Sequence, residues 1–232
     1  MASNSPPFSI ADATSADVPV LASIFQDAFS TDTHTQLKSI GKSPNYQADS
    51  MAGGLSFWLQ QPAKCSLIKA VDDSTGEILG WTCWGRRGTD ASTASKPASP
   101  EVEVPTDIEA DSLKRLEILT NADMRRFMDK IMPPGTACMY IIASSVHPKH
   151  QGRGIGSALI NYGTSEADSK GVFCWVHSSE AGRWAFGKAG FEEIERLEVD
   201  LGEYARQLPN ALSKEREWGK YVFRYMVRQP KE

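Results

Sequence analysis

The sequence has few cysteines and no long apolar run. Only four of its 232 residues are cysteine, too few for the disulfide framework of a small secreted scaffold. No stretch approaches the roughly 20 apolar residues that a membrane-spanning helix needs. The first ten residues, MASNSPPFSI, lack the basic start and apolar core of a signal peptide. We therefore expect a cytoplasmic protein that makes no contact with a membrane.

An excess of basic charge is also missing. Lys and Arg number 25 against 29 Asp and Glu, for a formal net charge of −4, so charge gives no reason to expect a nucleic-acid partner.

Metal ligands are sparse as well. Cys174 and His177 lie three apart in an expected strand and would point to opposite faces, and HPKH, 147–150, is followed by no obvious further ligand. Since structural zinc takes four ligands at fixed spacing, we expect no metal site.

What the sequence does contain is an alternation of strand-like and helix-like segments. Strands are expected at 8–13, 65–71, 78–84, 136–146, 171–176, 191–201 and 219–228, and helices at 14–28, 49–60, 107–132, from 155 onward and at 180–189. The segment 31–48 reads as irregular, and 88–106, rich in Ser, Thr, Ala and Pro, reads as a mobile loop. This order predicts one α/β domain over 8–228, built around a central sheet.

A glycine-rich stretch stands between an apolar strand and a helix-like pattern. In HPKHQGRGIGSALI, 147–160, three glycines (Gly152, Gly154 and Gly156) fall within five positions. Glycines so close together indicate a tight turn or a close approach to a ligand. The N–H groups of a following helix would point toward the loop, which makes an anion site for which phosphate is the usual guest. A tight turn without a ligand is the other reading.

Spacing separates the phosphate-binding motifs. A Walker A loop needs a lysine after its last glycine, but Ser157 follows Gly156. The dinucleotide fingerprint needs a third glycine where Ser157 stands, and an acidic residue at the end of the next strand, where His177 stands. Both motifs are therefore disfavoured.

The remaining pattern, Q/R-x-x-G-x-G/A, is met by Gln151, Gly154 and Gly156. VHPKHQGRGIGSALI resembles the hallmark of the GNAT superfamily of N-acetyltransferases. SSEAGRWAFGKAGF is similar to a second segment of that family, a short helix ending in an aromatic residue followed by GF. The resemblance covers most of 8–201, and 146–191 is its specific part.

This resemblance implies a GNAT-like fold, with a mixed, mostly antiparallel sheet flanked by helices, and acetyl-CoA as the co-substrate. It places the cofactor in a core over 137–201, with the pyrophosphate on the glycine loop and the pantetheine along the strand that ends at Val146. The cofactor-binding residues it implies are Ser144, Val146, Gln151, Gly152, Arg153, Gly154, Ile155, Gly156, Ser157 and Phe186. The implied reaction is acetyl transfer to a primary amine by direct attack in a ternary complex. No acidic or peptide-shaped groove can be read from the chain, which favours a small-molecule amine over a protein lysine or N-terminus.

The sequence departs from the family where catalysis is concerned. The family often has a tyrosine proton donor where Phe186 stands, and an asparagine where Ser179 stands. We take His177 as the candidate base, or else as a strand-end residue, and Ser179 as a second catalytic candidate. Loss of the tyrosine leaves a rival reading, a non-catalytic acyl-CoA-binding module.

Acceptor contacts are expected from the first half of the chain. Trp84 and Arg86, in WTCWGRR, could line the acceptor site, or they could belong to a core strand with a solvated basic end. The last strand, 219–228, could complete the sheet or pair across a homodimer.

Overall fold

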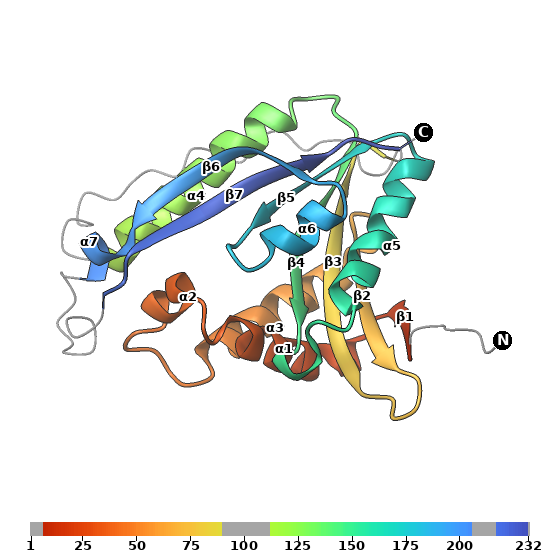
Figure 1. The fold of residues 1–232 in the computed structure, drawn as a ribbon, viewed down its shortest axis with the longest axis horizontal. Helices are drawn as coiled ribbons and strands as arrows, with labels where there is room; N and C mark the ends of the chain where they lie inside the picture. Colours follow the sequence, from red (N-terminus) through yellow and green to blue (C-terminus); the bar gives the residue numbers. More distant parts are fainter. Residues whose placement is uncertain (1–6, 90–111, 206–216, 232) are drawn as a thin grey trace.

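The computed structural model describes residues 7–89, 112–205 and 217–231 (Figure 1). Its strands are β1 Phe8–Asp12, β2 Cys65–Asp72, β3 Ile78–Arg87, β4 Cys138–Val146, β5 Phe173–Ser178, β6 Glu192–Asp200 and β7 Lys220–Arg228. Its helices are α1 Val18–Phe29, α2 Thr33–Lys38, α3 Tyr46–Leu59, α4 Ser112–Ile131, α5 Ile155–Ser169, α6 Arg183–Lys188 and α7 Leu201–Ala205, with 3₁₀ turns at Ser15–Asp17 and Pro148–His150. The expected mobile loop, 88–106, lies outside the described residues from position 90 onward.

The strands form one seven-stranded sheet in the order β1-β2-β3-β4-β5-β7-β6. Only β4 and β5 run parallel, and the other neighbours are antiparallel. This confirms the predicted single α/β fold with a mixed, mostly antiparallel sheet. Strand β7 lies between β5 and β6, so it completes the sheet and has no free edge with which to pair across a dimer.

Strands β4 and β5 separate part of the way along the sheet. Their pairing runs from Cys138↔Phe173 to Ile141↔Val176 and goes no further, although β4 continues to Val146 and β5 to Ser178. The two ribbons diverge visibly in Figure 1. The pairing between the β1–β4 half of the sheet and its β5-β7-β6 half therefore ends partway along the two strands, and we call this gap in the pairing the slot.

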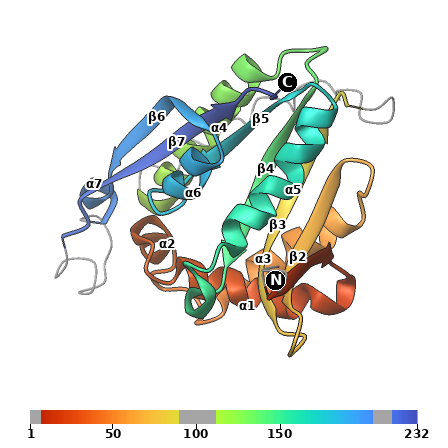
Figure 2. The same ribbon diagram turned by 45° about the vertical axis from the view of Figure 1, so that its right-hand side comes forward.

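Helices cover both faces of the sheet. Leu21 of α1 and Leu55 of α3 pack with Trp81 on one face of β3. Leu159 of α5 packs with Trp84 on the opposite face, and Figure 2 shows α5 lying over β3 and β4. Helix α4 covers the β5–β7 part from the α1 side, because its Phe127 stacks on Tyr225 with ring centroids 4.0 Å apart.

The distance of α5 from the sheet is set by a glycine. A Cβ on Gly163 would lie 2.1 Å from Cε2 of Trp84, a distance at which the two atoms would overlap. The indole of Trp84 is completely buried, and its N–H donates a hydrogen bond to the carbonyl of Leu159 at 3.2 Å. Helix α5 therefore lies directly on the tryptophan ring. This contact fixes the helix whose first turn follows the glycine loop.

The expectation of an irregular segment over 31–48 is wrong in part. Residues 33–38 form α2, and α3 begins at Tyr46. Asp32 caps α2 by accepting a hydrogen bond from the backbone N–H of Thr35 at 2.8 Å, and Leu37 anchors the helix because it is completely buried. One buried residue in a six-residue polar helix gives no periodicity to read. The short helix α7 was also not predicted, and its first residue, Leu201, was assigned to the end of the preceding strand.

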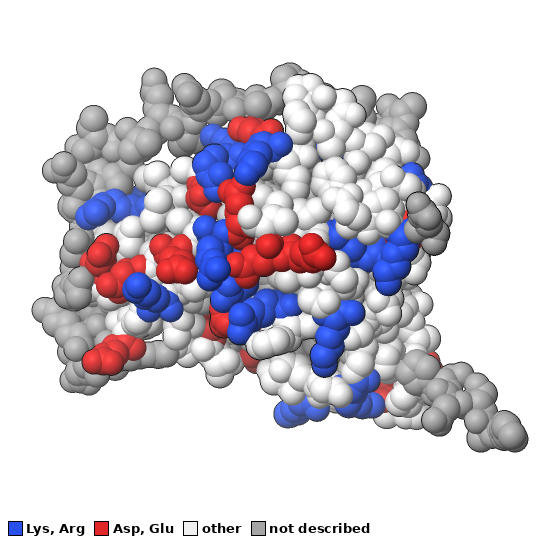
Figure 3. Space-filling view, turned by 45° about the horizontal axis from the view of Figure 1, so that its top comes forward, with Lys and Arg blue, Asp and Glu red and all other residues white. Residues whose placement is uncertain are grey.

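Charged side chains interleave on the face shown in Figure 3, with Lys and Arg set between Asp and Glu. Arg126 of α4 donates to Glu195 of β6 at 2.9 Å, and Lys130 pairs with the same carboxylate. Arg196 pairs with Glu193 at 3.0 Å. These pairs cover the edge strand β6 with charge, which blunts an edge that could otherwise pair with another chain.

Replacing Gly163 with alanine should destabilise the fold, because the new methyl group must displace Trp84 or lift α5. We expect a loss of about 1–3 kcal/mol in the free energy of unfolding, as for other overpacked cores. Gly53→Ala is the matched control: it is also a mid-helix glycine, but a Cβ there meets nothing within 4 Å. This control should stabilise α3 by about 0.5–1 kcal/mol. Urea unfolding measures both, and equal shifts in the two variants would contradict the role of Gly163.

Candidate active site

The glycine loop ends in an exposed helix start. Gly152 and Gly154 have φ angles of +76° and +84°, a conformation that L-residues rarely adopt. The first hydrogen bond into α5 runs from the N–H of Ala158 to the carbonyl of Gly154 at 3.0 Å. The N–H groups of Ile155, Gly156 and Ser157 therefore have no partner within the helix. Together with the helix dipole they form a candidate anion site.

Position 156 is a glycine for a different reason from positions 152 and 154. Gly156 has an ordinary helical φ, and a Cβ there would lie 3.6 Å from Cγ2 of Val146, which is normal van der Waals contact. Gly152 and Gly154 are therefore required by the backbone conformation, whereas Gly156 keeps the first helical turn free of a side chain.

Polar side chains hold the loop in place. The side-chain amide of Gln151 donates to the carbonyl of Val146 at 3.1 Å. The guanidinium of Arg153 lies 3.0 Å from Nδ1 of His150 and 3.9 Å from the Asp72 carboxylate. His150 in turn contacts Glu77 at 3.1 Å. Arg153 is thus linked to the β2–β3 hairpin and brings a positive charge beside the anion site.

One edge of β4 is open beside this loop. The N–H of His147 donates to the carbonyl of Leu79 on β3 at 2.9 Å. Backbone groups alternate in direction along a strand, so Ser145 and Ala143 also face β3, while the main chains of Ser144 and Val146 face the other way. That side is the slot from which β5 has departed. A register shift opposite Cys83 and Trp84 leaves one extra residue in β4 where the slot begins.

Phe186 and Ser179 lie on the α5–α6 side of the slot. Phe186 is buried in the main core, with its ring 5.7 Å from that of Phe191. A Cβ on Gly182 would lie 3.2 Å from Cε2 of Phe186 and 3.0 Å from Oγ of Ser178, which places the phenyl ring beside the end of β5. The hydroxyl of Ser179 accepts a hydrogen bond from the N–H of Gly182 at 3.3 Å, a contact that supports the turn into α6.

His177 lies on the opposite face of the sheet. Its ring stacks on Tyr225 at 4.7 Å and on Phe223 at 5.1 Å. Its Nε2 atom is buried and has no hydrogen-bond partner among the described residues. Burial lowers the pKa of the ring to about 4. His177 is therefore neutral at neutral pH.

The expectation that Trp84 and Arg86 line the acceptor site is also wrong. Trp84 is completely buried beneath α5. Arg86 donates from Nε and Nη2 to the two carboxylate oxygens of Glu166 at 2.8 and 2.9 Å, and only 13% of its side chain is exposed. Both side chains fasten α5 to the sheet. The core-strand reading holds for Trp84, but its solvated basic end does not hold for Arg86, which is mostly buried against Glu166.

A cluster of rings around His177 was not predicted from the sequence. We define the histidine–aromatic cluster as His34, His177, Tyr221, Phe223 and Tyr225. The ring of His34 contacts Phe223 edge-on at 4.9 Å and lies 5.4 Å from Tyr221. The aromatic residues alternate in YVFRY, 221–225, which does signal one shared face of a strand. His34 could not be added, because its helix was not expected.

The hydroxyls at the edge of the histidine–aromatic cluster are satisfied. Tyr221 donates to Oδ2 of Asp32 at 2.7 Å, and Tyr225 donates to Oδ2 of Asp123 at 2.6 Å. The Nε2 atom of His34, like that of His177, is buried without a partner among the described residues. Burial lowers the pKa of His34 to about 4 as well.

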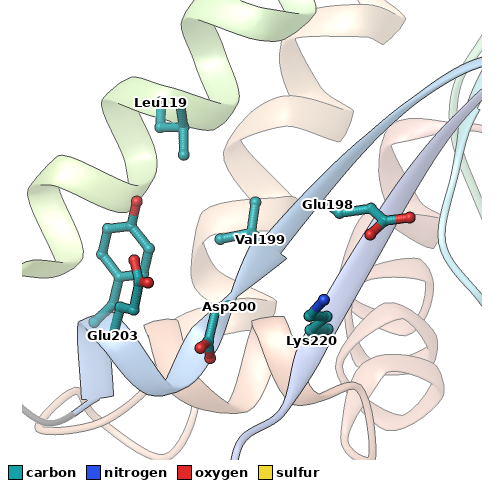
Figure 4. Close-up of a pocket in the computed structure, with 7 residues that line it drawn as sticks. Leu119, Glu198, Val199, Asp200, Glu203 and Lys220 are labelled. Carbon is teal, nitrogen blue, oxygen red and sulfur yellow. The ribbon is translucent and has the colours of Figure 1, made fainter.

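A separate pocket of about 400 Å³ lies at the sheet edge (Figure 4). It is lined by Leu119, Glu198, Val199, Asp200, Glu203, Tyr204 and Lys220. These residues come from α4, β6, α7 and β7, and none belongs to the glycine loop, β4 or β5. We therefore leave the pocket out of the candidate site.

The described residues, 7–89, 112–205 and 217–231, were considered for metal sites and membrane-spanning helices. Within them, no group of three or more His, Cys, Asp or Glu side chains is placed to hold a metal ion. No helix in these ranges combines the length and apolarity needed to cross a membrane. All four cysteines are buried free thiols.

Solved structures share this fold. A Corynebacterium glutamicum protein titled as histone acetyltransferase HPA2 and related acetyltransferase has a TM-score of 0.56 at 17% identity, covering 97% of this chain and 98% of its own. A putative arylalkylamine N-acetyltransferase 7 from the mosquito Aedes aegypti has a TM-score of 0.61 at 15% identity, covering 96% and 87%. A phosphinothricin acetyltransferase from Sinorhizobium meliloti, in complex with acetyl-CoA, has 0.54 at 14%, covering 97% and 90%.

A search of curated protein sequences returned no match. The family model described as the acetyltransferase (GNAT) family, however, matches residues 33–191, well over half of the chain, including the glycine loop and the slot. The chain therefore belongs to the GNAT family of acetyltransferases, which are acyltransferases that use acetyl-CoA as the acetyl donor.

Proposed function

We propose that the protein transfers the acetyl group of acetyl-CoA to a primary amine of a small molecule, by direct attack in a ternary complex. The observation that carries this proposal is the continuity of two features. The anion site at the start of α5 leads directly into the open edge of β4, and that edge borders the slot between β4 and β5. A long donor with phosphates at one end and a thioester at the other fits such a path.

The donor's two parts call for different contacts. The pyrophosphate would accept hydrogen bonds from the N–H groups of Ile155, Gly156 and Ser157, and Arg153 would add a positive charge. The pantetheine amides would pair with the main chains of Ser144 and Val146, as an added strand does. Gln151 supports this edge, since it already bonds the Val146 carbonyl.

The chemistry requires one bond to form and one to break. The amine nitrogen attacks the thioester carbonyl carbon, and a main-chain N–H at the slot stabilises the charge that develops on the carbonyl oxygen. The C–S bond then breaks and the thiolate departs, while the amine proton goes to water. Phe186 has no proton to give, but a thiol with a pKa near 8.5 leaves tolerably well without an acid. The Ser179 hydroxyl accepts the Gly182 N–H through a lone pair, so its own proton stays available for the departing sulfur.

A small acceptor is favoured by the enclosure of the histidine–aromatic cluster. The Nε2 atoms of His34 and His177 are shielded from solvent, whereas a peptide lysine would need an open groove to reach the slot. Membership of the family favours acetyl transfer. The tyrosine that is missing at Phe186 is the argument for the rival role, a non-catalytic acyl-CoA-binding module. Thiol release in the presence of an amine separates the two.

Binding of the donor should depend on the backbone of the glycine loop. Gly154→Glu places a carboxylate where phosphate would bind, so acetyl-CoA affinity measured by calorimetry should fall from the micromolar range to near loss. Gly53→Glu is the control, because it adds the same charge at an exposed glycine of α3, outside the loop, where a Cβ meets nothing within 4 Å, and it should bind close to the native level. A folded native chain that does not bind acetyl-CoA would overturn the donor assignment. Normal binding by Gly154→Glu would overturn the role of the loop.

Restoring an acid at the departing sulfur should speed the reaction. Phe186→Tyr adds an O–H beside the end of β5, and general acids commonly contribute about 10²–10⁴-fold. We expect kcat to rise at least about tenfold where C–S cleavage limits the rate. Phe191→Tyr, in the neighbouring ring, is the control and should leave kcat unchanged. An unchanged kcat for Phe186→Tyr would show that no acid is missing there.

The pH profile should lack a histidine step. The pKa of His177 is lowered to about 4, so the ring is already deprotonated across the working range. The rate constant kcat/KM should therefore rise with pH only as the acceptor ammonium loses its proton. Initial rates from about pH 5.5 to 9.5 would test this. A separate rise near pH 6.5 that disappears in His177→Phe would contradict it and make His177 a base of ordinary pKa.

A further inference from the structure

Two histidines far apart in sequence meet on one phenyl ring. His34 comes from α2 and His177 from β5, and their ring centroids lie 4.9 and 5.1 Å from that of Phe223. His34 touches the ring edge-on and His177 stacks on it. Tyr221 and Tyr225 extend the apolar wall on both sides. The result is a patch of flat rings whose hydrogen-bonding atoms lie at its edges.

The polar atoms of this patch are unevenly satisfied. Both tyrosine hydroxyls bond carboxylates, whereas Nε2 of each histidine is buried without a partner among the described residues. Buried polar atoms nearly always have partners, and leaving one unpaired is destabilising. Two such atoms, one from each histidine, lie beside the Phe223 ring. A bound guest would offset this cost by supplying the missing hydrogen bonds.

The position of the patch relates it to the slot. His177 follows Val176, the last β5 residue paired with β4. Its side chain lies on the α4 face, whereas the glycine loop leads into α5 on the opposite face. A donor thioester that enters the slot from the α5 side would therefore end beside His177. A guest on the patch would approach the same point from the α2 side.

We propose that the histidine–aromatic cluster is the acceptor site, and that its guest is a monoamine carrying an aromatic ring. This inference rests on the proposed acetyl transfer. The guest's ring packs against Phe223 and the tyrosines, and the imidazole nitrogens hydrogen-bond its amine and one further polar group.

The surrounding charges select this class of amine. The carboxylates of Asp32 and Asp123 are already engaged by Tyr221 and Tyr225, so they offer little to a second or third ammonium. A polyamine or a lysine-rich peptide would leave its extra charges against apolar rings. A single amine can instead lose its proton on entry, as nucleophilic attack requires. The cluster's own rings fill this space in the free protein, so the guest would enter by displacing the partly exposed His34 ring from the edge of Phe223.

The test compares His34→Phe with His34→Gln. Phenylalanine keeps the ring but removes the unpaired nitrogen, so the free protein should melt a few degrees higher while the acceptor KM rises about tenfold. The KM for acetyl-CoA should not change. Glutamine keeps a polar group and should restore part of the acceptor affinity. A higher melting temperature with an unchanged acceptor KM would show a purely structural histidine and overturn the proposal.

The acceptor class is tested with 2-phenylethylamine, tyramine, spermidine and a lysine-containing peptide, read as thiol release from acetyl-CoA. We expect the two aromatic amines to have the highest kcat/KM, and preference for spermidine or the peptide would overturn the assignment. If acetyl-CoA binds but no amine is acetylated, the proposed function fails. NMR of the His34 and His177 imidazoles then decides the site separately: signals that shift with 2-phenylethylamine support it, and unmoved signals refute it.

Discussion

The site depends on the parting of β4 from β5 after Ile141 and Val176. Up to that point the two strands are paired, and beyond it the main chain of β4 no longer pairs with β5, although Gln151 bonds the Val146 carbonyl. A regular sheet would have no such edge in its middle. The extra residue of β4 opposite Cys83 and Trp84 lies where the strands begin to diverge, as expected of a bulge that bends a strand out of its ladder. Everything proposed for the donor and the acceptor is arranged on the two faces of this opening.

The two faces have opposite chemical character. The α5 face is positive and polar at the loop, because helix N–H groups and Arg153 lie there. The α2 face is built from neutral rings. Burial keeps His34 and His177 uncharged, so the proposed acceptor side favours an amine in its neutral form. The loop, by contrast, favours phosphates. The contact between Gly163 and Trp84, with the Arg86–Glu166 pair, holds the loop's helix at a fixed height over the opening.

The donor side could be read from the sequence because its determinants are local. Gln151, Gly154 and Gly156 lie close together in the chain; backbone conformation requires glycine at Gly154, and Gln151 bonds the Val146 carbonyl five residues before it. The acceptor side could not be read, since His34 and Phe223 are brought together by a six-residue helix without periodicity. The prediction that Trp84 and Arg86 line the acceptor site was wrong for a related reason. A strand with two tryptophans and two arginines looks the same whether it faces a ligand or a helix, and only the position of α5 decides between them.

The place of β7 in the sheet has a consequence for how the protein is made. This strand is the last in sequence, yet it lies between β5 and β6. During synthesis the β1–β4 half, with α5 and its loop, can assemble while β5 and β6 still lack their shared neighbour. Tyr221, Phe223 and Tyr225 emerge from the ribosome after every other part of the opening. A nascent chain can therefore hold the phosphate loop in its final form before it has an acceptor side, so competence for transfer arrives only with the final strand.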